Sequence, residues 1–206
     1  MSTNQNHGKE FENIVKLAFG LDNEDNIAYT AEWDIPSIFD KDNIPTSIKT
    51  SKNLTICMAD ARSFLSINDE FRLVIGIYTQ QGTKKQFVKI IEYSIIDETF
   101  SIIKGNLTYG DVVNFHNAIQ LDNISDYIEA RKLAKKIKIS LANRITLIRL
   151  NPKIDHLKQR RLQCSLRLND LDSIKDIKKS LYIKEYRGII IPFDIESSKR
   201  EFLKRK

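Results

Sequence analysis

Apolar residues near the start of the chain recur with the spacing of an α-helix. Phe11, Ile14 and Val15 lie three and four positions apart, so one helical face would carry all three side chains. Gly20 follows this stretch, and glycine is common just past the last residue of a helix. The pattern therefore predicts a helix over residues 8–19.

Runs rich in isoleucine, valine and aromatic residues follow, separated by turn residues, which is typical of β-strands. A short helix is predicted over residues 60–67, with Asp60 near its start as a capping residue. Pro36 has no amide hydrogen to donate, so it must lie at an edge or at the end of its strand. Strands are predicted over residues 27–39, 44–51, 54–58, 71–79 and 87–96.

The second half of the chain mixes helical and strand-like patterns. Helices are predicted over residues 109–121 and 126–141, the second of them capped by Ser125. The apolar stripe of this second helix consists of Ile128, Leu133, Ile137 and Leu141. The remaining predictions are strands over 145–150, 162–168 and 188–193, a helix over 173–181 and a charged helical tail over 197–206.

The 206 residues are 41% hydrophobic and 29% charged, a composition that is typical of a globular domain. No apolar run reaches the about 18 residues that a membrane helix needs, and the first residues show no secretory signal pattern. The expected location is therefore the cytoplasm, with no membrane association. The seven glycines form none of the motifs with which glycine-rich loops hold nucleotide phosphates.

Charge is distributed unevenly along the chain. Residues 1–103 hold 10 Lys and Arg against 15 Asp and Glu, whereas residues 104–206 hold 23 against 12. An acidic half can hold metal ions and a basic half can bind phosphates, which is one way to build an enzyme that acts on nucleic acids. Basic surfaces are also often merely solvated, so charge alone leaves both interpretations open.

Asp34, Ser47 and Lys49 form the candidate catalytic group. Side chains alternate along a strand, so Ser47 and Lys49 would face one side of the strand 44–51 while Ile48 faces the other. A hairpin between this strand and the preceding one would bring Asp34 close to Lys49. The oxygens of Asp34 would bind Mg²⁺, or Mn²⁺ as a substitute. The Lys49 ammonium would position the attacking water and stabilise the transition state.

The first predicted helix carries Glu12, close to the apolar face that includes Phe11. Its carboxylate would supply a further metal ligand or hold a metal-bound water. Glu32 alternates with Asp34 along the predicted strand and is a second candidate for this role. Plain alternatives stand beside these assignments, since an isolated Asp–Lys pair is usually a surface ion pair and a helical glutamate is usually solvated.

Three features in order along the chain carry a resemblance to a known family: Gly8-Lys-Glu-Phe-Glu12 on the first helix, then Asp34, then Lys49 fifteen residues later. Over about residues 8–80 the chain resembles the PD-(D/E)xK nuclease superfamily, and within it Type II restriction endonucleases. The resemblance implies an αβββαβ core, Mg²⁺-dependent hydrolysis of double-stranded DNA, a homodimer on a palindromic site and a cognate DNA methyltransferase as functional partner. It also implies that the main-chain carbonyl of Ile48 ligates the metal.

Two positions depart from the family pattern. The acidic residue of the (D/E)-x-Lys motif is Ser47 here, so a second carboxylate must come from elsewhere, with Glu12 and Glu32 as candidates. Some members carry a neutral polar residue at that position, so Ser47 is compatible with activity. The proline that precedes the aspartate in the family is Trp33 here, which matters less because that proline ligates nothing.

A basic segment in the second half is the candidate DNA-binding region. Arginine and glutamine can make bidentate contacts to guanine and adenine, whereas lysines more often contact phosphates. If the strand over 162–168 begins as early as Arg160, Arg161 and Gln163 share one face and become the preferred base-reading pair. A solvated basic turn is the alternative. The candidates are Arg62, Lys153, Lys158, Arg160, Arg161, Gln163 and Arg167, and a second basic surface consists of Lys132, Lys135, Lys136 and Lys138.

Together these features predict an α/β fold with a restriction-endonuclease-like αβββαβ core, a central mixed sheet flanked by helices, and a basic C-terminal α+β extension. The whole chain would form one nuclease domain, with a catalytic core over about residues 8–97 and a DNA-binding extension over about 109–206. The expected activity is that of a sequence-specific DNA endonuclease. Two alternatives stay open: a structure-selective or repair nuclease of the same superfamily, and a DNA-binding module that has lost catalysis, which Ser47 favours.

Overall fold

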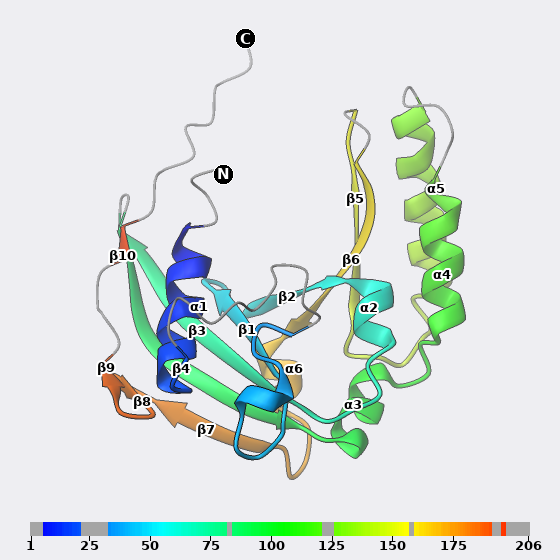
Figure 1. The fold of residues 1–206 in the computed structure, drawn as a ribbon. Helices are drawn as coiled ribbons and strands as arrows, with labels where there is room; N and C mark the ends of the chain where they lie inside the picture. Colours follow the sequence, from blue (N-terminus) through cyan, green and yellow to red (C-terminus); the bar gives the residue numbers. More distant parts are fainter. Residues whose placement is uncertain are drawn as a thin grey trace. The chain divides into compact units, whose positions relative to one another are not determined.

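Two units that interleave along the sequence make up the chain. The computed structural model describes residues 6–21, 33–81, 84–120, 126–156, 159–190 and 195–196 (Figure 1). The first unit comprises Met1–Leu54, Glu70–Ile95 and Ile177–Lys206, and the second comprises Thr55–Asp69 and Ile96–Asp176. The ranges 8–97 and 109–206 that the sequence distinguishes therefore each contribute to both units.

A mixed five-stranded sheet forms the centre of the first unit. Its strands are β1 (Thr46–Ser51), β3 (Phe71–Gln81), β4 (Lys84–Ile95), β7 (Lys178–Tyr182) and β10 (Ile195–Glu196). β1 runs parallel to β3, whereas β4 is antiparallel to β3, β7 and β10. A hairpin of β8 (Glu185–Tyr186) and β9 (Ile189–Ile190) belongs to the same unit. The expected mixed central sheet is thus present.

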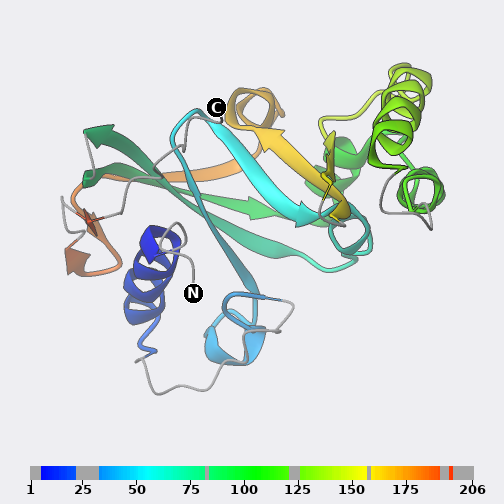
Figure 2. The same ribbon diagram turned by 90° about the horizontal axis from the view of Figure 1, so that it is seen from above.

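Helix α1 (Asn6–Ala18) packs on one face of this sheet, as Figure 2 shows. Phe11 and Val15, which share the predicted apolar face, are fully buried in a core that also contains Ile48. The ring of Phe11 stacks on that of Phe87 with the centroids 4.7 Å apart. Gly76 permits this packing, because a Cβ atom there would lie 2.6–2.7 Å from the two rings. The helix predicted near the start of the chain is therefore confirmed.

The second unit combines a three-stranded antiparallel sheet with helices. The strand order is β2 (Thr55–Asp60), β6 (Arg160–Arg167) and β5 (Arg149–Ile154). The described helices are α2 (Ala61–Leu65), α3 (Asp97–Lys104), α4 (Tyr109–Ala118), α5 (Tyr127–Ser140) and α6 (Leu168–Asp172). Phe64 of α2 meets Phe100 of α3 edge to face, with the ring centroids 5.3 Å apart. Buried apolar residues on the helices and on β6 give this unit its own core.

Side-chain caps fix the starts of two helices in the second unit. Asp60 accepts hydrogen bonds from the backbone N–H groups of Arg62 and Ser63 and so caps α2, as the sequence predicts. Thr108 and Asp111 form a reciprocal capping box at the start of α4. Each cap satisfies backbone donors that the first helical turn leaves without partners, which typically stabilises a helix by about 1 kcal/mol.

The strand predicted over residues 27–39 is wrong over the part that the structure describes, which begins at residue 33. There the chain forms a single backbone bridge between Ile35 and Thr46, followed by the 3-10 helix η1 (Ser37–Phe39). Pro36 explains the break, because it lacks the N–H group that a continuing strand would donate to its neighbour. The earlier part of the predicted strand, residues 27–32, lies outside the described residues.

The strand predicted over 145–150 is displaced by four residues. The observed strand β5 begins at Arg149 and continues through Pro152 to Ile154. Proline is normally excluded from the interior of a sheet, and it is tolerated here because β5 is an edge strand. The strand predicted over 162–168 corresponds to β6, which begins two residues earlier.

The helix predicted over 173–181 is also wrong. Ser173 is already the C-cap of α6, and β7 begins at Lys178. Asp176 between them has a φ of 61°, a left-handed conformation that a continuing α-helix excludes. The chain therefore turns at this point and enters the sheet of the first unit as a strand.

Helix α5 buries only part of the predicted stripe, because Ile137 and Leu141 are half-buried on the face of Ala130 and Ala134. Ala130 and Ala134 are its buried residues, whereas Ile128 in the stripe is 54% exposed. Alanine has a small side chain, so a row of alanines lets a helix approach its neighbours closely. Ser125, the predicted cap, and the tail over 197–206 lie outside the described residues. None of the helices that the structure describes is long and apolar enough to span a membrane.

Candidate functional site

The candidate catalytic group lies in the first unit, where a backbone bridge holds Asp34 beside β1. The N–H of Ile35 donates to the carbonyl of Thr46 over 3.0 Å, and the N–H of Thr46 donates to the carbonyl of Ile35 over 2.8 Å. This reciprocal pair fixes the chain at the residue next to Asp34. The carboxylate of Asp34 consequently lies within hydrogen-bonding distance of the next residues of β1.

Arg72 of β3 anchors the loop that joins Asp34 to β1. Its Nη1 donates to Oδ2 of Asp40 over 2.8 Å and to Oγ1 of Thr46 over 3.2 Å, and its Nε lies 3.2 Å from Oε1 of Glu92. The side chains of Arg72 and Asp40 are almost fully buried. Breaking a buried ion pair of this kind typically costs about 3–5 kcal/mol, so the position of the loop is strongly specified.

Three donors from β1 converge on one oxygen of Asp34. Its Oδ2 accepts hydrogen bonds from the N–H of Ile48 over 2.6 Å, from Nζ of Lys49 over 3.0 Å and from Oγ of Ser47 over 3.4 Å. The expected proximity of Asp34 and Lys49 is confirmed, while their catalytic role stays a prediction. Among the described residues no hydrogen bond reaches Oδ1 of Asp34, so that oxygen keeps its lone pairs for another ligand.

The residues of β1 alternate between two faces as predicted. Ile48 is buried in the core with Phe11 of α1, whereas Ser47 and Lys49 are half-buried on the opposite face. Nζ of Lys49 lies 3.0 Å from the main-chain oxygen of Ile48 as well as 3.0 Å from Oδ2 of Asp34. The side chains of Asp34 and Lys49 are 29% and 22% exposed, so solvent reaches the pair.

The two oxygens that the Lys49 ammonium bridges belong to Asp34 and Ile48, two of the three metal ligands expected from the sequence. A carboxylate and a carbonyl are hard oxygen ligands, and Mg²⁺ commonly retains several waters where a protein supplies only one or two carboxylates. The donor set of Asp34 and Ile48 therefore fits Mg²⁺, which would compete with the ammonium for these oxygens. In the described part of the chain, no group of three or more His, Cys, Asp and Glu could hold a metal ion.

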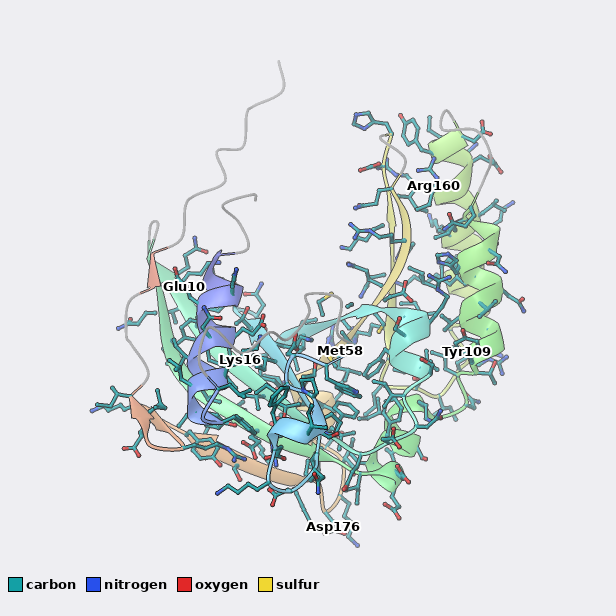
Figure 3. All side chains as sticks on the ribbon, in the orientation of Figure 1. Glu10, Lys16, Met58, Tyr109, Arg160 and Asp176 are labelled. Carbon is teal, nitrogen blue, oxygen red and sulfur yellow. The ribbon has the colours of Figure 1, made fainter. Side chains whose placement is uncertain are left out.

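Glu12 is not joined to this group. Its Oε1 accepts a hydrogen bond from Nζ of Lys16, one turn further along α1, over 2.6 Å (Lys16 is labelled in Figure 3). The adjacent Phe11 lies in the core with Ile48, whereas Lys49 faces the opposite side of β1. The role of Glu12 as a metal ligand stays a prediction that would need a new side-chain conformation. Glu32, the other candidate carboxylate, lies outside the described residues.

The base-reading candidates lie in the second unit, on β6. This strand begins at Arg160, and its residues alternate so that Leu162 and Cys164 are buried while Arg161 is exposed and Gln163 is half-buried. The predicted sharing of one face by Arg161 and Gln163 is therefore confirmed. We call this side of the sheet the open face of β6; base reading by its residues stays a prediction.

The register between β5 and β6 brings more polar residues to the open face. Lys153 lies opposite Arg161, and Asn151 lies opposite Gln163. Arg167 is exposed at the end of β6. Like charges directly opposite each other on neighbouring strands are destabilising, so the pairing of Lys153 with Arg161 is an arrangement that a bound anion would stabilise.

Arg160 belongs to the other face of β6 and is buried (Figure 3). Its Nη1 donates to the main-chain carbonyl oxygens of Asp155 over 2.7 Å and of Gln159 over 2.9 Å. The guanidinium thus holds the turn between β5 and β6. Arg160 therefore packs against the turn and does not lie on the open face. This agrees with strand alternation, which puts Arg160 and Arg161 on opposite faces.

Arg62 lies at the start of α2 against Asp60, with its Nε 3.3 Å from Oδ1 of the carboxylate. Burial would raise the pKa of Asp60, but hydrogen bonds from Arg62 and from the backbone of Ser63 outweigh it and hold that pKa below its ordinary value. Burial and the charge of Arg62 lower the pKa of His116, against the opposing effect of Asp60. Arg62 is therefore engaged locally, and Lys158 lies outside the described residues.

Two residues of the open face, Arg149 and Asn151, were not among the residues predicted from the sequence. Nδ2 of Asn151 donates to Oγ of Ser165 on β6 over 2.8 Å, and Nη2 of Arg149 lies 3.6 Å from Oδ2 of Asp170. The strand predicted over 145–150 ends before Asn151, so the alternation that places both residues on one face was not recognised. The alternation of polar residues at positions 149, 151 and 153 could have indicated this strand and its polar face.

In comparisons with family models, curated proteins and solved structures, nothing matches this chain. The likeness to restriction endonucleases therefore stays a resemblance of residues and motifs. The functional conclusion depends on the geometry around Asp34 and Lys49 and on the charge of the open face of β6.

Proposed function

We propose that this protein is a Mg²⁺-dependent endonuclease that hydrolyses double-stranded DNA at specific sequences, as Type II restriction enzymes do. The observation that carries the proposal is the position of the Lys49 ammonium, 3.0 Å from both the Asp34 carboxylate and the Ile48 carbonyl. These groups can hold a hard cation and act on water beside a phosphate. The basic open face of β6 supports DNA as the substrate.

In the proposed mechanism, Asp34 and the carbonyl of Ile48 would hold Mg²⁺, which when bound supplies Lewis-acid stabilisation of the phosphate oxygens. Lys49 would orient the attacking water and stabilise the negative charge that develops on the phosphate. Ser47 donates to Asp34 and so helps to orient its carboxylate. Glu12 would contribute a further ligand only after leaving Lys16.

The same proposal includes the biological setting of such enzymes. The protein would act in the cytoplasm as a homodimer on a palindromic site, because two copies of the catalytic group are needed to cut both strands together. A cognate DNA methyltransferase would protect the cell's own copies of the site. Mn²⁺ would substitute for Mg²⁺, since it accepts the same oxygen ligands.

Incubation of the purified protein with supercoiled plasmid and Mg²⁺ tests the proposal. Discrete fragments are expected, with their loss in Lys49→Ala but not in Lys52→Ala, an exposed lysine just past β1 that serves as the matched control. Smearing or junction-specific cuts would indicate a structure-selective nuclease instead. Unchanged cleavage in excess EDTA would refute the metal-dependent mechanism.

A DNA-binding module without catalysis is the second candidate function. Ser47 occupies the acidic position of the motif, and the described residues contain no group of three acidic, histidine or cysteine side chains for a metal. The serine at this position is the observation that favours this candidate. A clean gel shift with DNA, together with no cleavage in either Mg²⁺ or Mn²⁺, would establish it.

A further inference from the structure

Two adjoining hollows lie along α5 and the edge strand β5, within the second unit. One hollow of about 600 Å³ has Leu107, Leu141, Ile148 and Leu150 among its lining residues. A second hollow of about 270 Å³ lies against Pro152 and Ile154. Lys135 and Lys138 of α5 line both hollows, so the two are parts of one groove, which we call the α5–β5 groove.

The charge of this groove has one sign. Arg131, Lys135, Lys138, Arg144 and Arg149 line it, and none of the described residues that line it is acidic. Arg144 and Arg149 form ion pairs with Asp111 and Asp170. Lys135 and Lys138 are exposed, and no ion pair joins either of them to an acidic residue in the described part of the chain. Of the described residues that line the groove, Lys135, Lys138 and Arg131 are therefore the cations that no acidic side chain neutralises.

Helical geometry separates these lysines from the other basic residues of α5. Positions 131, 135 and 138 lie four and three residues apart and so share one side of the helix. Arg131 is held in place, because its Nε and Nη2 both donate to the carbonyl of Ile154 on β5, over 3.1 and 2.9 Å. Lys132 and Lys136 do not line the groove.

We propose that the α5–β5 groove binds the sugar-phosphate backbone of double-stranded DNA. The groove is lined by residues of both α5 and β5, carries a helical row of cations and has no acidic residue among its described lining residues, which fits a linear polyanion. Such contacts carry no sequence information, so the groove would supply affinity, and Arg161 and Gln163 on the open face of β6 would supply specificity. This inference rests on the proposed function for its choice of DNA as the polyanion.

A double variant, Lys135→Ala with Lys138→Ala, tests the groove against a matched control, Lys132→Ala with Lys136→Ala. Both variants remove two positive charges from exposed positions of the same helix. Binding of a short duplex of arbitrary sequence is measured by fluorescence anisotropy in EDTA between about 50 and 200 mM salt. Each phosphate contact contributes about 0.9 to the slope of log K against log salt, so the groove variant should lose roughly 1.8 of slope. The control should retain the slope of the unsubstituted protein.

The outcomes separate this inference from the function on which it rests. If the unsubstituted protein binds no DNA, the proposed function and the groove fail together. If it binds DNA but the groove variant keeps its slope, or if both variants lose slope equally, only the groove inference is overturned. Thermal unfolding of both variants checks that the fold is intact, which is expected because the four lysines are exposed.

Discussion

At the scale of single residues, substitutions of Asp34 and Lys49 can distinguish a catalytic role of this pair from a purely structural one. A partly exposed ion pair contributes about 0–1 kcal/mol to stability, and its side chains are 29% and 22% exposed. A group that stabilises transition-state charge has a much larger effect on rate than on folding. Measuring both the cleavage rate and the free energy of unfolding of each variant therefore distinguishes the two roles.

We expect Lys49→Ala and Asp34→Asn each to lower the cleavage rate by about a hundred- to a thousandfold. Asparagine keeps an acceptor for the N–H of Ile48, so the local backbone should persist in that variant. Single-turnover cleavage with Mg²⁺ gives the rate, and urea unfolding checks that stability changes by about 1 kcal/mol or less. Near-normal cleavage by either variant would remove the assigned catalytic group.

His116 gives a prediction for the effect of pH on stability. Burial and the charge of Arg62 lower the pKa of His116 in the folded state, although Asp60 opposes them, whereas the unfolded chain has the ordinary value of about 6.5. The unfolded state therefore binds more protons as the pH falls below about 6.5, and the free energy of unfolding should decrease there. His116→Gln should flatten this dependence. The test is to measure the melting temperatures of both proteins between about pH 5 and pH 8. Parallel plots of melting temperature against pH would contradict the attribution of this dependence to His116.

At the scale of elements, β6 turns neighbouring arginines to opposite faces, and the two should respond differently to truncation. Arg160→Ala removes a buried donor from the carbonyls of Asp155 and Gln159, which should destabilise the protein by about 1–3 kcal/mol. Arg161→Ala, on the exposed face, should change stability by less than about 0.5 kcal/mol. Urea unfolding of the two variants provides the measurement. Equal losses would mean that the faces of β6 are misassigned.

A separate prediction concerns the open face of β6 and the preference of the protein for its own DNA site. Once the cut site is known from mapped fragments, Arg161→Ala and Gln163→Ala should reduce the preference for that site over scrambled DNA. The loss of a bidentate base contact costs about 1–3 kcal/mol of discrimination. Lys153→Ala should weaken binding to both sequences alike, because a lysine there would contact phosphate. An unchanged preference in the Arg161 and Gln163 variants would exclude this face as the reader.

The elements also show what the sequence pattern can and cannot predict. Helix α1 was predictable from its apolar periodicity and strand β3 from its continuous apolar run, because both signals are strong and local. The pairing of Asp34 with Lys49 was predictable because strand alternation and a short connection restrict it. The turn of the chain at Asp176 was not predictable, because it depends on the left-handed backbone conformation of that single residue. The buried alanines of α5 give no hydrophobic signal, since their burial depends on what packs against them.

At the scale of the whole molecule, the proposed double-strand cleavage requires two copies of the chain. Each chain of 23.9 kDa carries one pair of Asp34 and Lys49, and a palindromic site presents the same sequence to two copies related by two-fold symmetry. Sedimentation equilibrium in the presence of cognate duplex should give two chains per duplex. One chain per duplex, combined with concerted cutting of both strands, would contradict the proposed assembly.

The interleaving of the two units has a consequence for how the protein is made. Residues of the first unit emerge from the ribosome both before and after those of the second unit, because β1 and β3 precede the second unit's α3 to α6 while β7 follows them. Chains fold as they are synthesised, starting from the N-terminus. A nascent chain that stops at Asp176 already contains Asp34 and Lys49, but it lacks β7 and the buried Tyr186 of the core. The order of synthesis thus delays completion of the sheet behind the proposed catalytic group until the second unit has been translated and β7 has followed it.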